Sequence, residues 1–435
     1  MDKNNGAIYD ARKLGKPKMI ILGVQHMFAM FGATILVPIL TGLDISTTLL
    51  MAGLGTLLFH CITKFKVPAF LGSSFAFLGG YAAIKAFSPN DPNSMLPYAC
   101  LGVACAGLIY FILAAVIKAV GIEKVMRFFP PVVTGPIIIA IGLGLAPSAV
   151  SNCTTNWFLA VVALAVIVVF NIWGKGMAKI IPIILGLLIS YGTGLVLYFI
   201  SQANPDLIQN VPWLFAGGAD ANGVYQPIFD FTSLNTICDN ISKGHIFGSE
   251  GLIGIPIHWD KTVFGGIDYS NGALIASSII AIVPIAFATM MEHIGDICAI
   301  SSTTGNNYIK DPGLHRTLVG DGLATTLASL FGGPANTTYG ENTGVLALTR
   351  VYDPRVIRIA AYFAVAVSFF PIVSVIIGSI PSCIIGGISF VLYGMISAIG
   401  VRNVVENKVD FTKSRNLIVA AVILVCAPVS YTHLT

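Results

Sequence analysis

Long apolar runs without a charged residue constrain the fold of this chain more than any other feature. Residues 27–40 and 160–170 are two such runs. They lack the alternation of polar and apolar residues that marks the strands of an outer-membrane β-barrel. A helix that crosses the hydrocarbon core of a membrane needs about 20 mostly apolar residues. The runs therefore predict membrane-spanning helices.

The scarcity of charge leads to the same prediction. Only 10% of the 435 residues are Asp, Glu, Lys or Arg, whereas soluble domains carry about 25%. So few charges cannot cover a soluble surface of this size, which excludes soluble enzymes, nucleic-acid binders and disordered scaffolds. The eight cysteines include no CxxC pair, so the sequence predicts no zinc or dithiol site. We expect an all-α polytopic membrane protein.

Thirteen apolar segments, which we number as spans one to thirteen, follow one another along the chain. They are residues 19–40, 47–62, 72–87, 97–120, 132–150, 157–173, 178–200, 273–292, 314–331, 340–349, 356–380, 383–401 and 417–426. Residues 1–18 form a polar amino terminus, and residues 201–271 form an acidic loop between spans seven and eight. Residues 427–435 are polar, and we expect them to be a truncated or non-native tail that shortens the last span.

Basic residues indicate the orientation, because Lys and Arg accumulate on the cytoplasmic side of a membrane. They cluster before span one and after each even-numbered span, as at Lys64 and Lys66, Lys175 and Lys179, or Arg355 and Arg358. This pattern predicts a cytoplasmic amino terminus and an extracytoplasmic loop at 201–271. His245 and His258 lie in that loop, and we interpret them as loop residues rather than metal ligands.

Short matches at a nearly constant offset indicate an internal repeat. They are Gln25-His26 with Glu292-His293 (292 − 25 = 267), Gly53-Leu54-Gly55-Thr56 with Gly322-Leu323-Ala324-Thr325 (322 − 53 = 269), and Pro68-Ala69 with Pro334-Ala335 (334 − 68 = 266). Seven spans separate the partners, and an odd number inverts the second copy in the membrane. Such repeats place transport sites at interrupted helices near the midplane.

Spans three and ten are short, and hydroxyl-rich stretches precede both. At the offset of 266, Phe75 and Glu341 occupy equivalent positions (341 − 75 = 266), each at the expected amino terminus of a half-helix. Free N–H groups and the helix dipole favour a negative charge at such a terminus.

Ionisable residues at membrane depth are costly and usually functional. The candidates are His26 in span one, Glu292, His293 and Asp296 at the end of span eight, Asp321 at the start of span nine, and Glu341 in span ten. Glu292 and Glu341 are the strongest, and Asp296 follows. His26 is either functional or a packing residue, Asp321 is either functional or an interfacial residue, and His293 is more readily structural.

Four sequence motifs resemble the nucleobase/ascorbate transporter family, also called nucleobase:cation symporter-2. Residues 25–34 (QHMFAMFGAT) resemble its first helix and residues 68–77 (PAFLGSSFAF) its third segment. Residues 311–316 (DPGLHR) and 336–342 (NTTYGEN) resemble the bacterial uracil permease branch. The resemblance implies two inverted seven-helix repeats, here with an incomplete last helix, and short antiparallel strands before the half-helices of spans three and ten.

The resemblance also implies a domain organisation. The first repeat would be residues 19–200 and the second residues 272–426. Spans one to four and eight to eleven would form a core domain, and spans five to seven with twelve and thirteen a gate domain. A homodimer through the gate domain, in the bacterial cytoplasmic membrane, is the implied assembly.

Carried over to this sequence, Glu292 and Glu341 would bind the base, Phe75 and Gly340 would supply backbone contacts, and Tyr339 and Asn342 would line the site. Glu341, Asp296 or His26 would carry a coupled proton, with no cofactor or metal. Uracil permeases usually have His where this chain has Asp296, and purine transporters of the family have Asp there and Gln at the position of Glu341. This sequence mixes the two signatures. Because Glu341 and Asn342 would contact the substrate directly, uracil:proton symport by alternating access is the favoured function, and xanthine or another oxopurine is the alternative substrate. The sequence shows neither the continuous polar pore that a channel needs nor the group of catalytic residues that a membrane enzyme needs.

Overall fold

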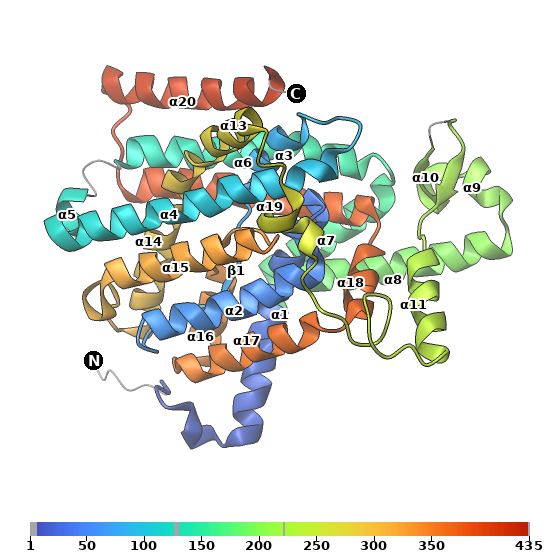
Figure 1. Ribbon diagram of the computed structural model, residues 1–435, viewed down its shortest axis with the longest axis horizontal. Helices are drawn as coiled ribbons and strands as arrows, with labels where there is room; N and C mark the ends of the chain where they lie inside the picture. Colours follow the sequence, from blue (N-terminus) through green and yellow to red (C-terminus); the bar gives the residue numbers. More distant parts are fainter. Residues whose placement is uncertain (1–6, 126–129, 221, 434–435) are drawn as a thin grey trace. The chain divides into compact units, whose positions relative to one another are not determined.

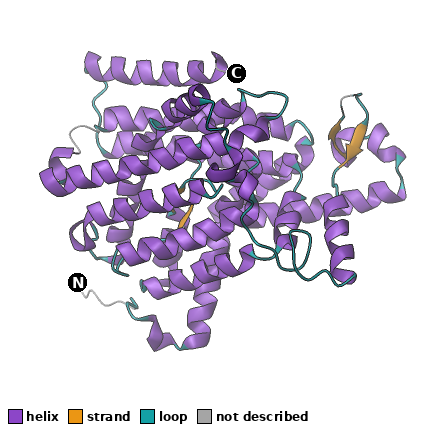
Figure 2. Ribbon diagram, viewed as in Figure 1, coloured by secondary structure: helices purple, strands orange, loops and turns teal. Residues whose placement is uncertain are grey.

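The computed structural model describes residues 7–125, 130–220 and 222–433; of Glu341 and residues 427–433 only the backbone is described. Helices dominate the described chain, and strands are few and short (Figures 1 and 2). Two compact units are present, and each contains segments from both halves of the sequence. Unit 1 comprises Met1–Pro130, Ile255–Phe370 and Tyr431–Thr435, and unit 2 comprises Pro131–Gly254 and Pro371–Ser430.

The helices of unit 1 include all those that flank the predicted half-helices. They are α1 (Lys16–Thr41), α2 (Ile45–Ile62), α3 (Leu78–Lys85), α4 (Leu96–Val120), α5 (Ile122–Val125), α12 (Val263–Gly266), α13 (Gly272–Ile282), α14 (Ile285–Thr304), α15 (Leu314–Leu330), α16 (Gly340–Thr349) and α17 (Pro354–Ser368). Strands β1 (Leu71–Ser73) and β4 (Asn336–Thr338) lie among them.

Unit 2 holds the remaining helices and a small hairpin. They are α6 (Pro131–Cys153), α7 (Trp157–Trp173), α8 (Pro182–Ala203), α9 (Asp206–Asn210), α10 (Pro212–Phe215), α11 (Thr232–Ser242), α18 (Pro371–Gly378), α19 (Ser382–Glu406) and most of α20 (Ser414–His433), with strands β2 (Ala216–Ala219) and β3 (Tyr225–Pro227). Helix α6 packs along α19, and α7 packs on α8. The loop between spans seven and eight contains α9, α10, α11, α12 and the hairpin of β2 and β3, so it is more structured than its polar composition predicts.

Seven helical segments in the described part of the chain are long and apolar enough to cross a membrane, and one of them, Gly272–Thr304, combines α13 and α14. The number is eight if α17 and α18 also count as one bent span. The others that match predicted spans are short, like α3 and α16, or less apolar, like α15. All thirteen predicted segments contain helix. The strands predicted before spans three and ten are confirmed as β1 and β4, which pair antiparallel.

Three predicted boundaries were wrong. Span eight does not end at Glu292, since α14 continues to Thr304. A break at Val283 and Pro284 also divides this span into α13 and α14. Span eleven is interrupted before Pro371, whose ring removes a backbone donor and disfavours helix in the residue before it. Helix α20 continues past the predicted end at Cys426.

Small residues let the helices of unit 1 approach closely. A Cβ atom added to Gly107 of α4 would stand 2.7 Å from the carbonyl oxygen of Gly322 in α15, and one added to Gly322 would stand 2.6 Å from that of Gly107. The buried rings of Phe59, Tyr81 and Tyr110 fill the surrounding core. This close packing is typical of membrane helices, whose association relies on close contact.

The register of the strand pair agrees with the repeat offset found in the sequence. Leu71 pairs with Thr338, and Gly72 pairs with Thr337. Adding 266 to 71 gives 337, and subtracting 266 from 338 gives 72, so the offset converts one pair into the other. The two strands are therefore related by a local two-fold axis that passes between these pairs.

Two threonines at repeat-equivalent positions support the strands. The Thr56 hydroxyl donates to the Leu71 carbonyl oxygen (3.1 Å) and accepts from the Leu71 N–H (2.9 Å), and the Thr325 hydroxyl donates to the Asn336 carbonyl oxygen (2.6 Å). Irregular backbone at membrane depth needs such partners, because hydrocarbon offers none.

We predict that Thr56→Val lowers the stability of the purified protein more than Thr325→Val does. The first leaves a buried N–H and a carbonyl without this partner, at a cost of about 1–3 kcal/mol, whereas the second affects only a carbonyl. Melting temperatures in detergent measure the difference. Thr193→Val is the matched control, since that exposed hydroxyl bonds only within α8. Equal melting temperatures for all three variants would contradict the prediction.

Candidate functional site

The candidate site lies where α14 and α16 meet the strand pair in unit 1. Chain direction explains the geometry, because β4 ends at Thr338 and α16 begins two residues later at Gly340. Tyr339 between them is extended and its side chain does not cap the helix. Gly340 is exposed, and a Cβ atom built there would meet nothing within 4 Å. The first turn of α16 thus presents an accessible helix amino terminus.

Glu292 and Asp296 lie one turn apart on α14, on a face that is not buried in the core. Glu292 is exposed, and Asp296 is half-buried. The Thr338 hydroxyl donates to a carboxylate oxygen of Asp296 at 2.8 Å, which ties α14 to the end of β4. The predicted pairing of these two acids on one helix face is therefore present, in the middle of α14 rather than at its end.

His293 and Asp321 form a fully buried pair. The Nδ1 atom of His293 lies 3.1 Å from Oδ2 of Asp321 and 3.5 Å from the Thr338 hydroxyl. Asp321 lies in the middle of α15 with no exposed surface. The interfacial alternative for Asp321 was therefore wrong, because α15 begins at Leu314 and carries this residue two turns into the core.

Asn342 connects α16 to α1. Its amide nitrogen donates to the Nδ1 atom of His26 (3.2 Å) and to the His26 carbonyl oxygen (3.1 Å). Both side chains are buried. This contact fixes the first turn of α16 against α1, so that Asn342 orients the half-helix. A direct contact between Asn342 and a substrate, and a proton on His26, stay predictions.

Tyr339 and Phe75 line the strand pair on the side of α1. The Tyr339 hydroxyl donates to the Ser73 carbonyl oxygen (2.9 Å) and accepts from the Thr34 hydroxyl (3.3 Å). The Tyr339 ring covers Gly72 so closely that a Cβ atom there would stand 2.5 Å from the ring. Phe75 is half-buried against the apolar cluster that contains Tyr339, Met30 and Phe70. The side chain of Glu341 lies outside the described residues, and only its place in the first turn of α16 is known.

The individual hydroxyl groups that hold the site together were not predicted from the sequence. Thr34 lies within the 25–34 motif and Thr338 within the 336–342 motif, but no contact was predicted for either residue. The signal was the density of Ser and Thr before each half-helix. What that density could not tell is which hydroxyl bonds to a carboxylate and which to backbone.

The comparisons with known proteins identify the family. The model of a family described as a permease family matches residues 17–434. The chain is 37% identical to a uracil permease of Bacillus caldolyticus and 38% identical to one of Bacillus subtilis, in each case over 93% of this chain and 84% of the relative. A putative pyrimidine permease, RutG, of Escherichia coli is 35% identical over 97% of this chain and 85% of the relative.

The chain belongs to the nucleobase:cation symporter-2 family of permeases. The predicted family is thus confirmed, and the protein is a multi-pass membrane protein of the transporter class.

Solved structures agree on the fold. The transmembrane domain of the cyanobacterial bicarbonate transporter BicA superposes with a TM-score of 0.65 over 98% of both chains, at 13% identity. SLC26A9 superposes with a TM-score of 0.53 over 97% of this chain and 63% of that chain, at 10% identity. At such low identity the match establishes the shared fold alone.

We predict that Gly72→Ala destabilises the protein. The new methyl group would overlap the Tyr339 ring and the Thr34 hydroxyl, which a Cβ atom would approach to 2.7 Å; overpacking of this kind costs about 1–3 kcal/mol. The melting temperature should fall relative to the unmodified protein. Gly394→Ala in α19 is the control, because nothing lies within 4 Å of its Cβ position. If both variants melt alike, the close packing of Tyr339 on Gly72 is contradicted.

Proposed function

We propose that this protein imports uracil by proton symport. The observation that carries the proposal is that α14, which bears the exposed carboxylate Glu292, packs against α16, whose amino terminus is accessible, in a chain that matches curated uracil permeases along most of its length. The two groups have opposite hydrogen-bonding character, which suits a base that has both N–H groups and carbonyl oxygens.

The chemistry of uracil fits these groups. Its ring N–H groups would donate to the Glu292 carboxylate, and hydrogen bonds to a charged acceptor are the strong ones. Its carbonyl oxygens would accept from the N–H groups of the first turn of α16, where the helix dipole is favourable. Glu341 in the same turn would hold the other N–H group, and the Phe75 ring would contact the face of the base.

Asp296 supports the alternative substrate, xanthine or another oxopurine. It stands where uracil permeases usually have His, and its carboxylate already accepts a hydrogen bond from Thr338. That contact gives Asp296 a role in joining α14 to β4 that does not depend on the substrate. We therefore favour uracil.

The coupled proton would reside on Glu341 or Asp296, with His26 as the other candidate. Protonation removes the charge of a carboxylate and so lowers the cost of moving it through a low-dielectric environment. Alternating access would then move unit 1, as the core domain, relative to unit 2, as the gate domain. The proposal includes a cytoplasmic amino terminus, the bacterial cytoplasmic membrane and a homodimer through the gate domain.

We predict that Glu292→Gln raises the dissociation constant of uracil at least tenfold. The amide is neutral and offers one acceptor oxygen in place of a charged pair, and a hydrogen bond to a charged group is worth about 1.5–3 kcal/mol. Isothermal titration calorimetry on the purified protein measures the change. Glu123→Gln, at an exposed position in α5, should bind uracil like the unmodified protein. Unchanged affinity in Glu292→Gln would remove Glu292 from the site.

We also predict that proteoliposomes accumulate labelled uracil when an inward proton gradient is imposed. A protonophore should abolish the accumulation, and a sodium gradient alone should not support it. Excess unlabelled xanthine should leave uracil uptake unchanged. Uptake of xanthine but not of uracil under the same gradient would establish the oxopurine alternative, and uptake driven only by sodium would contradict proton coupling.

A further inference from the structure

A short segment before α1 is bound to the loop that follows α16. We call residues 8–14, which include the 3-10 helix Ala11–Leu14, the strap. The Ile8 N–H donates to the Arg350 carbonyl oxygen and the Tyr352 N–H donates to the Ile8 carbonyl oxygen, both at 2.8 Å. These bonds pair Ile8 with Val351 like neighbouring strands. Arg350 is the C-cap residue that directly follows the last residue of α16, Thr349.

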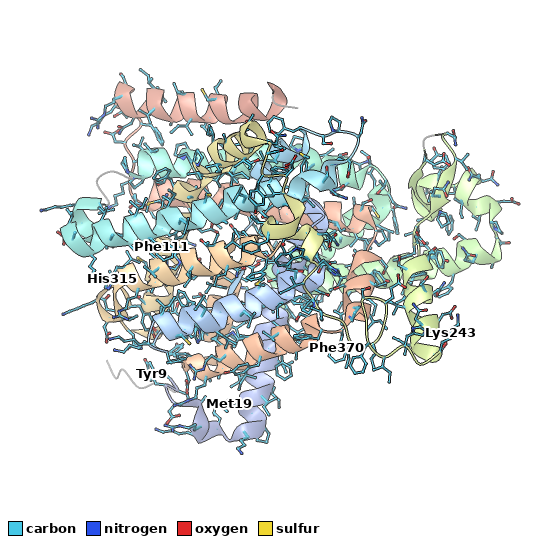
Figure 3. The ribbon with its side chains drawn as sticks, viewed as in Figure 1. Tyr9, Met19, Phe111, Lys243, His315 and Phe370 are labelled. Atoms are coloured by element: carbon cyan, nitrogen blue, oxygen red, sulfur yellow. The ribbon has the colours of Figure 1, made fainter. Side chains whose placement is uncertain are left out.

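The strap also reaches the end of α14. The Tyr9 hydroxyl donates to the Thr304 carbonyl oxygen at 2.7 Å, and Thr304 is the last residue of α14. The Tyr9 ring packs edge-on against Tyr352, with 5.4 Å between ring centroids. Tyr9 therefore contacts both segments at once. Figure 3 labels Tyr9 near the amino-terminal end of the described chain.

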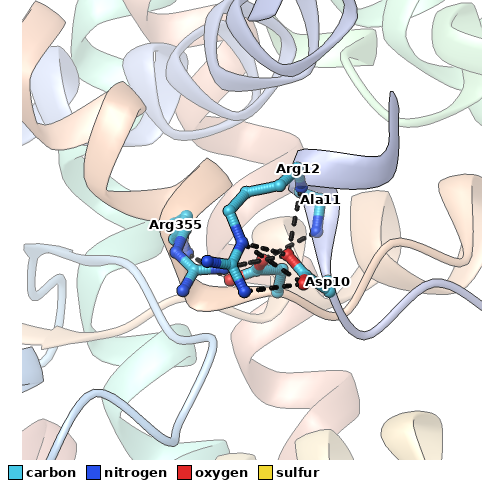
Figure 4. A network of polar contacts seen from close by, with 5 residues as sticks. Asp10, Ala11, Arg12 and Arg355 are labelled. Atoms are coloured by element: carbon cyan, nitrogen blue, oxygen red, sulfur yellow. Dashed lines mark hydrogen bonds and ion pairs between the residues drawn. The ribbon is translucent and has the colours of Figure 1, made fainter. Parts of the chain in front are cut away.

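Charged groups hold the strap on α17 (Figure 4). The Ala11 N–H donates to Asp353 Oδ2 at 2.7 Å, and Arg355 Nη1 donates to Asp10 Oδ1 at 3.0 Å and to Asp353 Oδ2 at 3.1 Å. The Arg12 side chain also donates to both oxygens of the Asp10 carboxylate. Asp353 also caps the first turn of α17 through the Arg355 N–H. The buried residues Ala11, Val351 and Val356 pack beneath this network.

The Asp10 carboxylate stays charged across the physiological range. The hydrogen bond from the Arg12 side chain is the main cause that lowers the pKa of Asp10 from 3.8 to about 2. The contribution of this carboxylate to folding stability is thus fully present above its ordinary pKa, and it is lost only as the pH falls through about 2. Mild acidification would therefore leave the contacts of Asp10 with Arg12 and Arg355 in place.

The two helices that the strap joins are the two that carry the candidate site. Helix α14 bears Glu292 and Asp296, and α16 presents its amino terminus. Near the strand pair the two helices are joined by the bond from Thr338 to Asp296. At their carboxyl ends they are joined through the strap.

We propose that the strap is a positioning element for substrate binding. It fixes the spacing between α14 and α16 and hence the distance between Glu292 and the amino terminus of α16. The inference rests on the proposed function for what is bound, but the effect of the strap on α16 can be measured without a substrate.

Two variants test the strap with little risk to folding. Tyr9→Phe removes the bond to α14 and keeps the ring on Tyr352. Asp10→Ala removes one of the two carboxylates that Arg355 contacts and keeps Asp353 as the cap of α17. Arg402→Ala is the matched control, because it breaks an exposed ion pair with Glu406 in α19. Hydrogen–deuterium exchange of the purified full chain, its melting temperature and its uracil dissociation constant are measured together.

The proposal predicts faster exchange in residues 340–353 for both test variants. It also predicts a dissociation constant raised about two- to tenfold, as expected for the loss of one hydrogen bond, at a nearly unchanged melting temperature. Arg402→Ala should change none of the three. A strap that exchanges faster while residues 340–353 and the dissociation constant do not change would overturn the proposal. So would faster exchange throughout the chain with a lowered melting temperature, which indicates a general structural role.

Failure of the proposed function gives a different result. If the unmodified protein binds no uracil in the same titration, the substrate assignment fails, and exchange alone decides on the strap. Faster exchange confined to residues 340–353 in the two variants then supports the positioning role, and unchanged exchange there overturns it.

Discussion

The hydrogen bonds that satisfy the interrupted backbone between β1 and β4 are the constraint on which the rest of unit 1 depends. Helices α3 and α16 begin only after these extended strands, and the free N–H and carbonyl groups of the strands need partners that hydrocarbon cannot supply. The strands supply them to each other, and Thr56 and Thr325 supply them from α2 and α15. This requirement explains why hydroxyl residues gather before each half-helix and why Gly72 is needed beneath Tyr339.

Helix α1 transmits this arrangement to the site. Thr34 contacts Tyr339 beside the strands, and His26 holds Asn342 in the first turn of α16. At the carboxyl end of α1, the Thr41 carbonyl oxygen accepts from the Lys85 amine at 2.9 Å and so anchors the end of α3. Both half-helices are thus fixed along one continuous helix, and α16 packs against α14. A site of this kind presents donors and acceptors at defined places, as recognition of a small planar base requires.

The sequence predicted the helical membrane fold and the repeat offset, because hydropathy, charge and short matches each leave a direct trace. The strand pair was predicted from the family resemblance. The sequence also placed span ten at 340–349, as the structure has α16. It failed where tertiary contacts decide. Nothing in the local pattern distinguishes Asp321 buried against His293 from Asp321 at an interface, and only the packing of α14 on α15 does so. The contacts of the strap could not be predicted either. A polar, basic terminus is expected to be solvated, and only the structure identifies Asp353 and Arg355 as its partners.

We propose that a nucleobase binds between Glu292 and the amino terminus of α16. Crystals of the full chain grown with 5-bromouracil test it most directly, because the anomalous signal of bromine locates the base. The account predicts one peak beside Phe75 and Gly340, with a ring N–H within hydrogen-bond distance of the Glu292 carboxylate. A bromine peak away from α14 and α16 would contradict it.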